Sequence, residues 1–420
     1  MKKYTVILFL ALITPTINIH AQYLEAYLVE AAENNPGIKA RYSEFEAALQ
    51  TINQADAIPD LTLSFGYFIS PIETRLGPQR AKFSLIQMFP WFGTGGAKEN
   101  AAIQRTESKY QAFLDAKNEL YYKVKAAYYP LYEIHVHIKQ QKENLNILNT
   151  YKELATTSFS NNKGSMVDVI RVDIIIESVI TEIQILEDQL KPLEIAFNRL
   201  LNRDESLQVE MIDSLGISNL QDSYQTRKDS ILTANPMLKS VEFRIQSAIA
   251  DEEVARKQGS PSLGIGIDYS IVGERTDIDV PDNGKNALMP MISMSLPIFR
   301  KKYKASVKEA QYTQTALLLA KEDMKNTLLT SFEMVWYEIE KAKLLHDQYI
   351  RQIEKTKQAI SLLHSAYSNS GKEFEEVLRM EQQLLKYKMS SASNLKIYYL
   401  ALAKLDYLSA RELESMIMDL

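Results

Sequence analysis

The chain contains two copies of one sequence pattern, about 200 residues apart. The offset between matching residues rises from 200 (Asn35 to Asn235) to 208 (Phe159 to Tyr367). Four segments recur in the same order: Asn35–Ala40 as Asn235–Ser240, Pro59–Tyr67 as Pro261–Tyr269, Phe89–Phe92 as Leu296–Phe299, and Phe159–Arg171 as Tyr367–Arg379. Since a repeat sets the architecture of a chain, the mature protein is predicted to be a tandem duplication.

Long stretches of the chain lack both glycine and proline. Between Pro297 and Gly371 lie 73 residues with neither, and the last 49 residues also lack both. As a helix, the first stretch would span roughly 110 Å at 1.5 Å per residue. The matching region of the first copy, 97–191, contains only Pro130 and Gly164. Each copy is therefore predicted to hold a hairpin of two very long helices, turning near Gly164 and Gly371.

Four short segments instead alternate between apolar and small or polar residues. In the clearest one, Leu263, Ile265 and Ile267 alternate with Gly264 and Gly266. Each segment is about 9–11 residues long, the length of a tilted strand that crosses a membrane. Alternation with a period of two is typical of strands with one face toward lipid and one toward water. A half-buried sheet in a soluble protein would show the same alternation.

The N-terminus is predicted to be an export signal. Lys2 and Lys3 precede an apolar run, Tyr4–Ile13, and the small residue Ala21 suits cleavage. A run of ten residues is too short to span a bilayer, which needs about 20. A short buried element is the alternative interpretation.

Composition excludes several classes of function. The net charge of -5 provides no basic field for nucleic acid. The absence of cysteine excludes disulfides, thiolate metal sites and a thiol nucleophile. His135 and His137 are two residues apart on a predicted helix and do not share a face. Without a phosphate loop or a nucleophile elbow, we expect no catalytic residue, no cofactor and no metal site, and hence no enzyme.

Four strands are too few to enclose an aqueous lumen. The smallest membrane barrels have eight strands and are filled by side chains. An open sheet in lipid would leave edge groups unsatisfied, each at a cost of several kcal/mol. The chain is therefore predicted to be an obligate oligomer, in which three copies would supply twelve strands. The segments 71–79 and 273–285 are polar and rich in turn formers, and we expect them to be loops at the strand tips.

The ordered set of features resembles the TolC family of outer membrane efflux proteins. The resemblance rests on Asn35-Pro36 and Asn235-Pro236, on the prolines that flank the strand pairs, and on the two helix-tip motifs Phe159–Ile170 and Tyr367–Leu378. It covers about residues 24–410. It implies a mainly α fold with a membrane β-barrel. In that fold, long helical hairpins form a periplasmic α-barrel, and four strands per protomer form a trimeric 12-stranded outer membrane barrel.

The resemblance also implies a function, a location and partners. Family members are passive ducts in the outer membrane of Gram-negative bacteria, with a long periplasmic extension. They dock a periplasmic adaptor protein and an inner membrane transporter of the RND, ABC or MFS type. Drugs, metal ions or other small molecules would be the cargo, and outer membrane lipid would surround the barrel. A periplasmic coiled-coil scaffold or adaptor that forms no channel is the alternative.

The helix tips are where the resemblance places the periplasmic gate and the adaptor-docking site. Asp168 and Glu376 match the first acidic position of the family's tip, whereas its second acidic position is Arg171 and Arg379 here. A ring of acids would select cations, but acid beside base can form ion pairs between helices. Solvated helix caps are the alternative. The predicted tip site comprises Gly164, Asp168, Arg171, Gly371, Glu375, Glu376 and Arg379.

These features give a division of the chain into five parts. A signal peptide (1–21) precedes the first repeat (22–202), a linker or equatorial region (203–225), the second repeat (226–410) and a tail (411–420). The strands are expected at about 60–70, 80–89, 262–272 and 287–296, and the hairpin tips near 160–168 and 368–376.

Overall fold

The computed structural model describes residues 22–212, 214–217, 222–370 and 374–411. The predicted signal peptide, and all of the predicted tail except Arg411, lie outside the described residues. The chain divides into two compact units. We call them the helical unit (described residues up to Pro36, Lys117–Arg227 and from Ser331 on) and the strand unit (Gly37–Ala116 and Lys228–Thr330).

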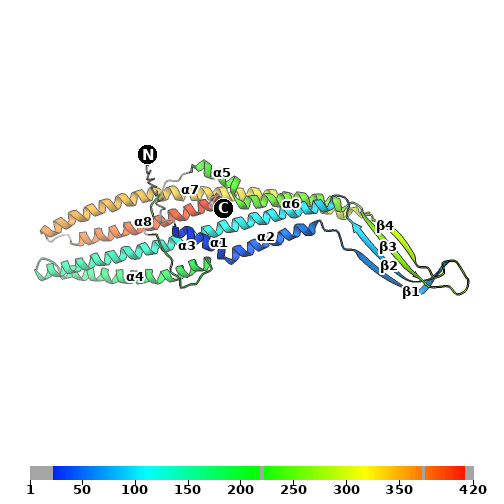
Figure 1. The fold of residues 1–420 in the computed structure, drawn as a ribbon. Helices are drawn as coiled ribbons and strands as arrows, with labels where there is room; N and C mark the ends of the chain where they lie inside the picture. Colours follow the sequence, from blue (N-terminus) through cyan, green and yellow to red (C-terminus); the bar gives the residue numbers. More distant parts are fainter. Residues whose placement is uncertain (1–21, 213, 218–221, 371–373, 412–420) are drawn as a thin grey trace, which may run out of the picture. The chain divides into compact units, whose positions relative to one another are not determined.

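The elements follow the same order in the two predicted repeats (Figure 1). The first repeat contains α1 (Gln22–Asn34), α2 (Pro36–Ala55), β1 (Thr62–Thr74), β2 (Gly77–Phe89), α3 (Thr94–Ser160) and α4 (Met166–Leu200). The second contains α5 (Tyr224–Ala234), α6 (Pro236–Gln258), β3 (Ser262–Val272), β4 (Ala287–Ser295), α7 (Arg300–Ser370) and α8 (Phe374–Leu408). Because α3 and α7 run through both compact units, each unit draws on both repeats.

Two helices open each repeat. The break falls at the Asn-Pro pairs, since a residue before proline is disfavoured in the α conformation. Pro36 and Pro236 are each the first residue of a helix, a position that needs no backbone N–H. The side chain of Asn235 caps α6 by accepting hydrogen bonds from the amides of Met237 (3.0 Å) and Leu238 (3.3 Å). The pairs therefore end one helix and start the next.

In the helical unit, the α3–α4 and α7–α8 hairpins lie side by side and share an apolar core (Figure 1). The α4 residues in this core recur at alternating spacings of three and four, as in a coiled coil. They are Val169, Val172, Ile176, Val179 and Ile183. Leu148, Tyr151 and Ala155 of α3 and Phe374, Val377 and Leu378 of α8 complete the cluster. No described helix is both long and apolar enough to cross a membrane.

The strand unit contains one antiparallel sheet of four strands in the order β1-β2-β3-β4. The central pair joins the two repeats, with Phe83 opposite Tyr269 and Leu85 opposite Ile267. The outer pairs lie within the repeats, with Phe65 opposite Phe83. Strands β1 and β4 are the two edges of this sheet.

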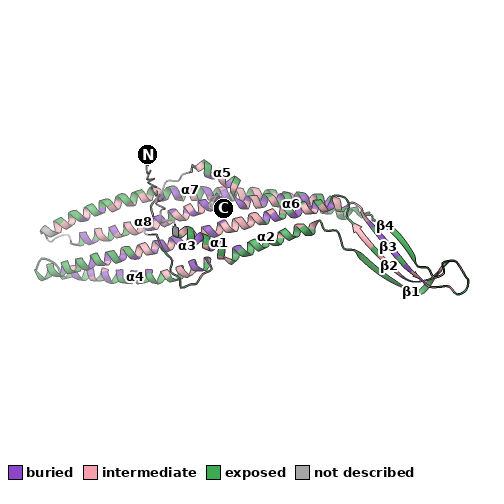
Figure 2. Ribbon diagram, in the orientation of Figure 1, coloured by how far each residue is buried: buried purple, intermediate pink, exposed green. Residues whose placement is uncertain are grey.

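The two faces of the sheet differ in chemistry. The apolar face, which we call the outer face, includes exposed Leu63, Phe65, Ile265 and Ile292 (68%, 63%, 63% and 84% exposed). Figure 2 shows β1 and β4 as largely exposed. On the opposite face, Asp268 is buried, pairs with Lys82 and accepts a hydrogen bond from Ser84 at 2.5 Å. The alternation in the sequence therefore separates an apolar from a polar face.

The loop predicted at 71–79 is wrong. Strand β1 continues to Thr74 and β2 begins at Gly77, so two residues connect them. Gly77 takes a left-handed conformation (φ 121°), and Thr74 Oγ1 donates to its carbonyl at 2.7 Å. Pro71 is tolerated because β1 is an edge strand and its register is irregular between Tyr67 and Ile72.

Candidate functional site

The tip of the α3–α4 hairpin is a tight turn stabilised by backbone hydrogen bonds. Asn162 takes the left-handed conformation (φ 54°), and the amide of Lys163 donates to the carbonyl of Ser158 at 2.8 Å. This geometry is the Schellman motif that ends many helices. Gly164 itself is not left-handed; a Cβ there would lie 3.0 Å from Cβ of Ser158, so close approach of the chain explains this glycine. Its counterpart Gly371 lies outside the described residues.

Asp168 belongs to a capping box at the start of α4. Ser165 Oγ accepts from the amide of Val167 (3.1 Å), and Asp168 Oδ2 accepts from the amide of Ser165 (3.3 Å). These bonds satisfy amides that have no partner within the helix. The carboxylate also lies at the positive end of the helix dipole. Asp168 therefore has a structural role at the tip, whatever its contribution to a gate.

An ion pair joins the ends of the two hairpins. Nη1 of Arg171 on α4 lies 3.2 Å from Oε2 of Glu375 on α8 and 3.8 Å from Oδ1 of Asp168. On α8, Glu376 Oε1 and Arg379 Nη2 are 2.5 Å apart, and this carboxylate raises the pKa of Arg379. Five of the seven predicted tip residues thus form two acid–base groups, one of which connects different helices.

A partly buried hydrogen-bonded cluster surrounds Tyr151 in the same hairpins. Tyr151 of α3 donates from Oη to Glu381 Oε1 of α8 (2.9 Å) and lies 2.7 Å from His364 Nε2 of α7. Because the hydroxyl has one proton, which Glu381 accepts, His364 Nε2 must be the donor to Tyr151. Burial, followed by the charge of Glu381, raises the pKa of Tyr151. This cluster ties three helices together.

Sequence reasoning missed the Tyr151 cluster. Its three members come from positions 151, 364 and 381, and no motif connects them. The available signal was weak: a tyrosine and a histidine within otherwise apolar helical patterns.

Tyrosines hold the linker between the repeats. Three of them accept hydrogen bonds from linker amides: Tyr27 from Glu210 (2.9 Å), Tyr128 from Ile212 (3.1 Å) and Tyr132 from Leu215 (2.9 Å). Tyr399 donates to the carbonyl of Gly216 at 2.6 Å. Burial raises the pKa of Tyr128 to about 12 and also raises the pKa of Tyr132. The described linker is therefore attached along its length to α1, α3 and α8.

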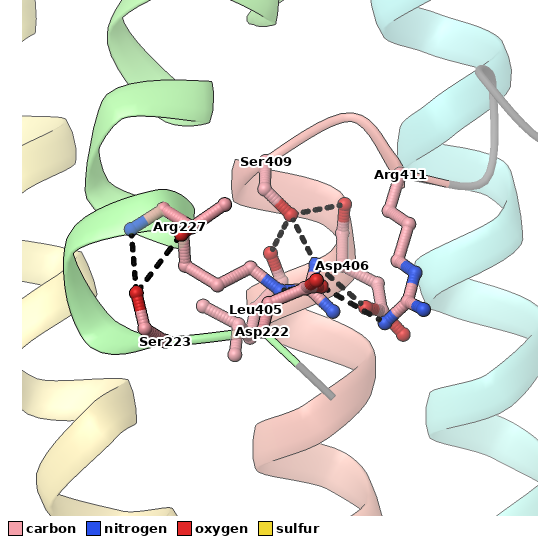
Figure 3. Close-up of polar contacts among 8 residues, drawn as sticks. Asp222, Ser223, Arg227, Leu405, Asp406, Ser409 and Arg411 are labelled. Atoms are coloured by element: carbon pink, nitrogen blue, oxygen red, sulfur yellow. Dashed lines mark hydrogen bonds and ion pairs between the residues drawn. The ribbon is translucent and has the colours of Figure 1, made fainter. Parts of the chain in front are cut away.

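A buried arginine joins the start of α5 to the end of α8 (Figure 3). The side chain of Arg227 is 3% exposed. Its Nε lies 3.0 Å from Asp222 Oδ2, and its Nη1 lies 3.2 Å from Asp406 Oδ1 and donates to Ser409 Oγ at 2.8 Å. Arg411 Nη1 lies 3.5 Å from Asp222 Oδ2. The charges of Arg227 and Asp406 are thus removed from water together.

The described residues contain no group of three or more His, Asp or Glu side chains that could hold a metal ion. The polar clusters above consist of ion pairs and hydrogen bonds.

The structure is similar to several solved membrane channels. The outer-membrane channel OprN matches with a TM-score of 0.76 at 15% sequence identity, over 92% of this chain and 89% of that chain. The outer membrane protein VceC from Vibrio cholerae matches with a TM-score of 0.73 at 16% identity, over 92% and 95%. The open state of the Neisseria gonorrhoeae MtrE outer membrane channel matches with a TM-score of 0.71 at 17% identity, over 92% and 88%.

These similarities confirm the predicted fold, in which long helical hairpins are combined with a four-stranded antiparallel sheet. The amino-acid sequence matches no model of a known protein family and no functionally characterised protein.

Proposed function

We propose that this chain is a TolC-family channel of the outer membrane of a Gram-negative bacterium, where it serves as the passive duct of a tripartite efflux system. One observation carries the proposal: the chain shares its fold with outer membrane channels over 92% of its length. The exposed apolar face of the sheet fits a lipid environment.

The functional form is a homotrimer. The edge strands β1 and β4 would each leave backbone groups without partners in lipid, and pairing with other copies satisfies them. Three copies supply twelve strands. The helices also offer contact surface, because α4 carries a second set of apolar residues outside its core seam. These are Ile170, Ile174, Ile180 and Ile185, each about half exposed or more.

The duct works with two partners and performs no chemistry itself. A periplasmic adaptor joins it to an inner membrane transporter of the RND, ABC or MFS type, which supplies the energy. Drugs, metal ions or other small molecules are the cargo. The charged tip residues would form the gate, with the Arg171–Glu375 pair holding neighbouring hairpins together when the duct is closed.

Electron microscopy of the detergent-extracted full-length particle tests this proposal. A three-fold tube that conducts ions in planar bilayers is the expected result. A particle without three-fold symmetry and without conductance would contradict the channel, and the hairpins would then fit a periplasmic scaffold.

A further inference from the structure

An apolar cavity of about 660 Å³ lies at the end of the sheet where the strands meet the helices. Leu263, Ile265 and Ile292 of the outer face form one wall. The remaining wall comes from segments next to the sheet, namely Ala55–Ile58, Phe89–Gly93, Gly95, Gly96 and Lys98. This volume lies within the range of small-molecule sites, about 300–1,000 Å³.

A second, more polar cavity of about 300 Å³ adjoins the first. The two share Pro90, Trp91 and Lys98, and the second adds Lys257 and several hydroxyl and amide side chains. Nζ of Lys257 lies 3.0 Å from where a Cβ on Gly93 would be. Lys98 therefore lines both cavities, and Lys257 lines the polar cavity next to Gly93 of the apolar one.

The chain next to these cavities is strongly basic. Residues 297–308 contain five Lys or Arg residues and no acidic residue. Among the described residues, Lys301, Lys302 and Lys304 form no ion pair. Ile298 and Phe299, just before them, are 71% and 81% exposed.

One acidic residue also lines the apolar cavity. The carboxylate of Asp56 lies beside Gly95, where its Oδ1 is 1.7 Å from the place of a Cβ. Lys257 also pairs with Glu253, at 3.6 Å. Lys98 and Lys257 therefore balance the charges of Asp56 and Glu253, and the net positive charge beside the two cavities comes from the basic stretch.

We propose that the two cavities form one binding site for an anionic phospholipid of the periplasmic leaflet. An acyl chain would occupy the apolar cavity, and the phosphate would lie between Lys98 and Lys257. Long basic side chains place their stems on apolar surface and their charges in the polar layer. Basic segments beside a membrane attract anionic headgroups, and Trp91 is a residue type enriched at this boundary. The inference rests on the proposed outer membrane location.

The combination of cavities favours a lipid over a water-soluble anion. A soluble phosphate compound would use the ammonium groups but would leave the apolar cavity empty. A zwitterionic lipid would fill that cavity but would gain less from the basic stretch, since its headgroup carries a compensating positive charge.

Native mass spectrometry of the detergent-extracted full-length protein can test the site, with phosphatidylglycerol and phosphatidylcholine of equal chain length as probes. We expect the wild-type protein to retain phosphatidylglycerol about tenfold better. The double variant Lys98→Gln/Lys257→Gln should lose most of this preference. The matched control Lys321→Gln/Lys325→Gln, on α7 and outside both cavities, should keep it.

Filling the apolar cavity tests the acyl chain separately. A side chain at Gly96 would enter open space, since a Cβ there has no atom within 4 Å. Gly96→Leu should therefore lower the retention of both phospholipids several-fold, whereas Gly96→Ala should leave it unchanged. Glycerol phosphate, which has no acyl chain, should not compete.

Equal retention of the two lipids by the wild-type protein, or variants that behave like the control, would overturn the phospholipid site. A wild-type protein that binds neither lipid would overturn it as well. The three-fold symmetry and conductance measurements are independent of these results, so they report whether the channel proposal fails with it.

Discussion

The guanidinium of Arg171 on α4 lies 3.2 Å from the carboxylate of Glu375 on α8. The side chains are 38% and 73% exposed, so the pair contributes little to stability, about 0.2–1 kcal/mol. Its value lies in its position, because it connects the free ends of two hairpins whose cores already pack together. A contact of this strength can hold a tip in place and still be broken by a partner.

We predict that Arg171→Ala and Glu375→Ala each raise the resting conductance of the channel in planar bilayers. The double variant should conduct no more than the stronger single variant, because both changes break the same contact. The control is the exposed pair at the other end of α4, Arg199 and Glu205, which are 2.7 Å apart. Additive effects of the two tip variants, or an equal effect of Arg199→Ala, would contradict a role for this ion pair in the gate.

The cap and gate roles of Asp168 can be separated by two substitutions. Asp168→Asn keeps an oxygen that can accept from the amide of Ser165 but removes the charge, whereas Asp168→Ala removes both. We expect Asp168→Ala to lower the free energy of unfolding by about 0.5–2 kcal/mol and Asp168→Asn to lower it much less. If the charge also gates, both variants should raise the resting conductance, as should Glu376→Ala. Normal conductance of Asp168→Asn would assign the residue to the cap alone.

The sequence predicted the elements well where a local pattern determines them. Period-two alternation in 262–272 matches β3, and the stretch without Gly or Pro after Pro297 is occupied by α7. Prediction from the sequence failed where the energetic cost of placing a residue in an element depends on the neighbouring strands. Pro71 was assigned to a loop but lies in a strand, because β1 pairs irregularly with β2 between Tyr67 and Ile72 and a proline is tolerated at such an irregularity.

The tip shows the same limit at the level of single residues. Its acidic and basic residues could be selected by their position in the repeat, but the partner of Arg171 could not. Glu375 lies 204 positions further along the chain, and this contact depends on how the hairpins pack. The left-handed turn residue is Asn162 rather than Gly164, since asparagine also tolerates that conformation.

Removing one partner of the buried Arg227–Asp406 pair should lower the stability of the helical unit. Arg227→Met or Asp406→Asn leaves a buried charge with fewer partners, and each should destabilise the helical unit by about 3–5 kcal/mol. The double variant should be less destabilised than the sum of the singles, because neither charge of the pair is left facing an uncharged partner. Urea unfolding of the four proteins measures this coupling. Additive losses would mean that the two side chains act independently.

The linker tyrosines predict a loss of stability at high pH. Burial raises the pKa of Tyr128 to about 12 in the folded protein, against about 10 in an unfolded chain. The folded state therefore binds the phenolic proton more tightly. The stability contributed by the protonated Tyr128 hydroxyl is complete below pH 10 and is lost as the pH rises toward 12.

Unfolding in urea at pH 8 to 12 should show this loss in the wild-type protein and less of it in Tyr128→Phe. At pH 8 the variant should be less stable by about 1–3 kcal/mol, because the amide of Ile212 loses its acceptor. Tyr312→Phe, at a residue 75% exposed, is the control and should match the wild type throughout. If Tyr128→Phe loses as much stability between pH 8 and pH 12 as the wild-type protein does, groups other than Tyr128 cause the loss.

The outer face of the sheet can be tested with single charges. Ile265 and Ile292 lie opposite each other on β3 and β4, and both are well exposed in the isolated chain. If this face meets lipid, Ile265→Arg or Ile292→Arg should reduce the amount of folded trimer in the outer membrane, at a cost below the about 2–4 kcal/mol of a site at the bilayer centre, because both residues lie toward the helix end of the sheet. The control is Ser64→Arg on the opposite face, where a charge stays in water and assembly should be nearly normal. The amount of heat-resistant trimer on gels of outer membrane fractions measures the outcome. Normal assembly of both isoleucine variants would show that this face does not contact lipid.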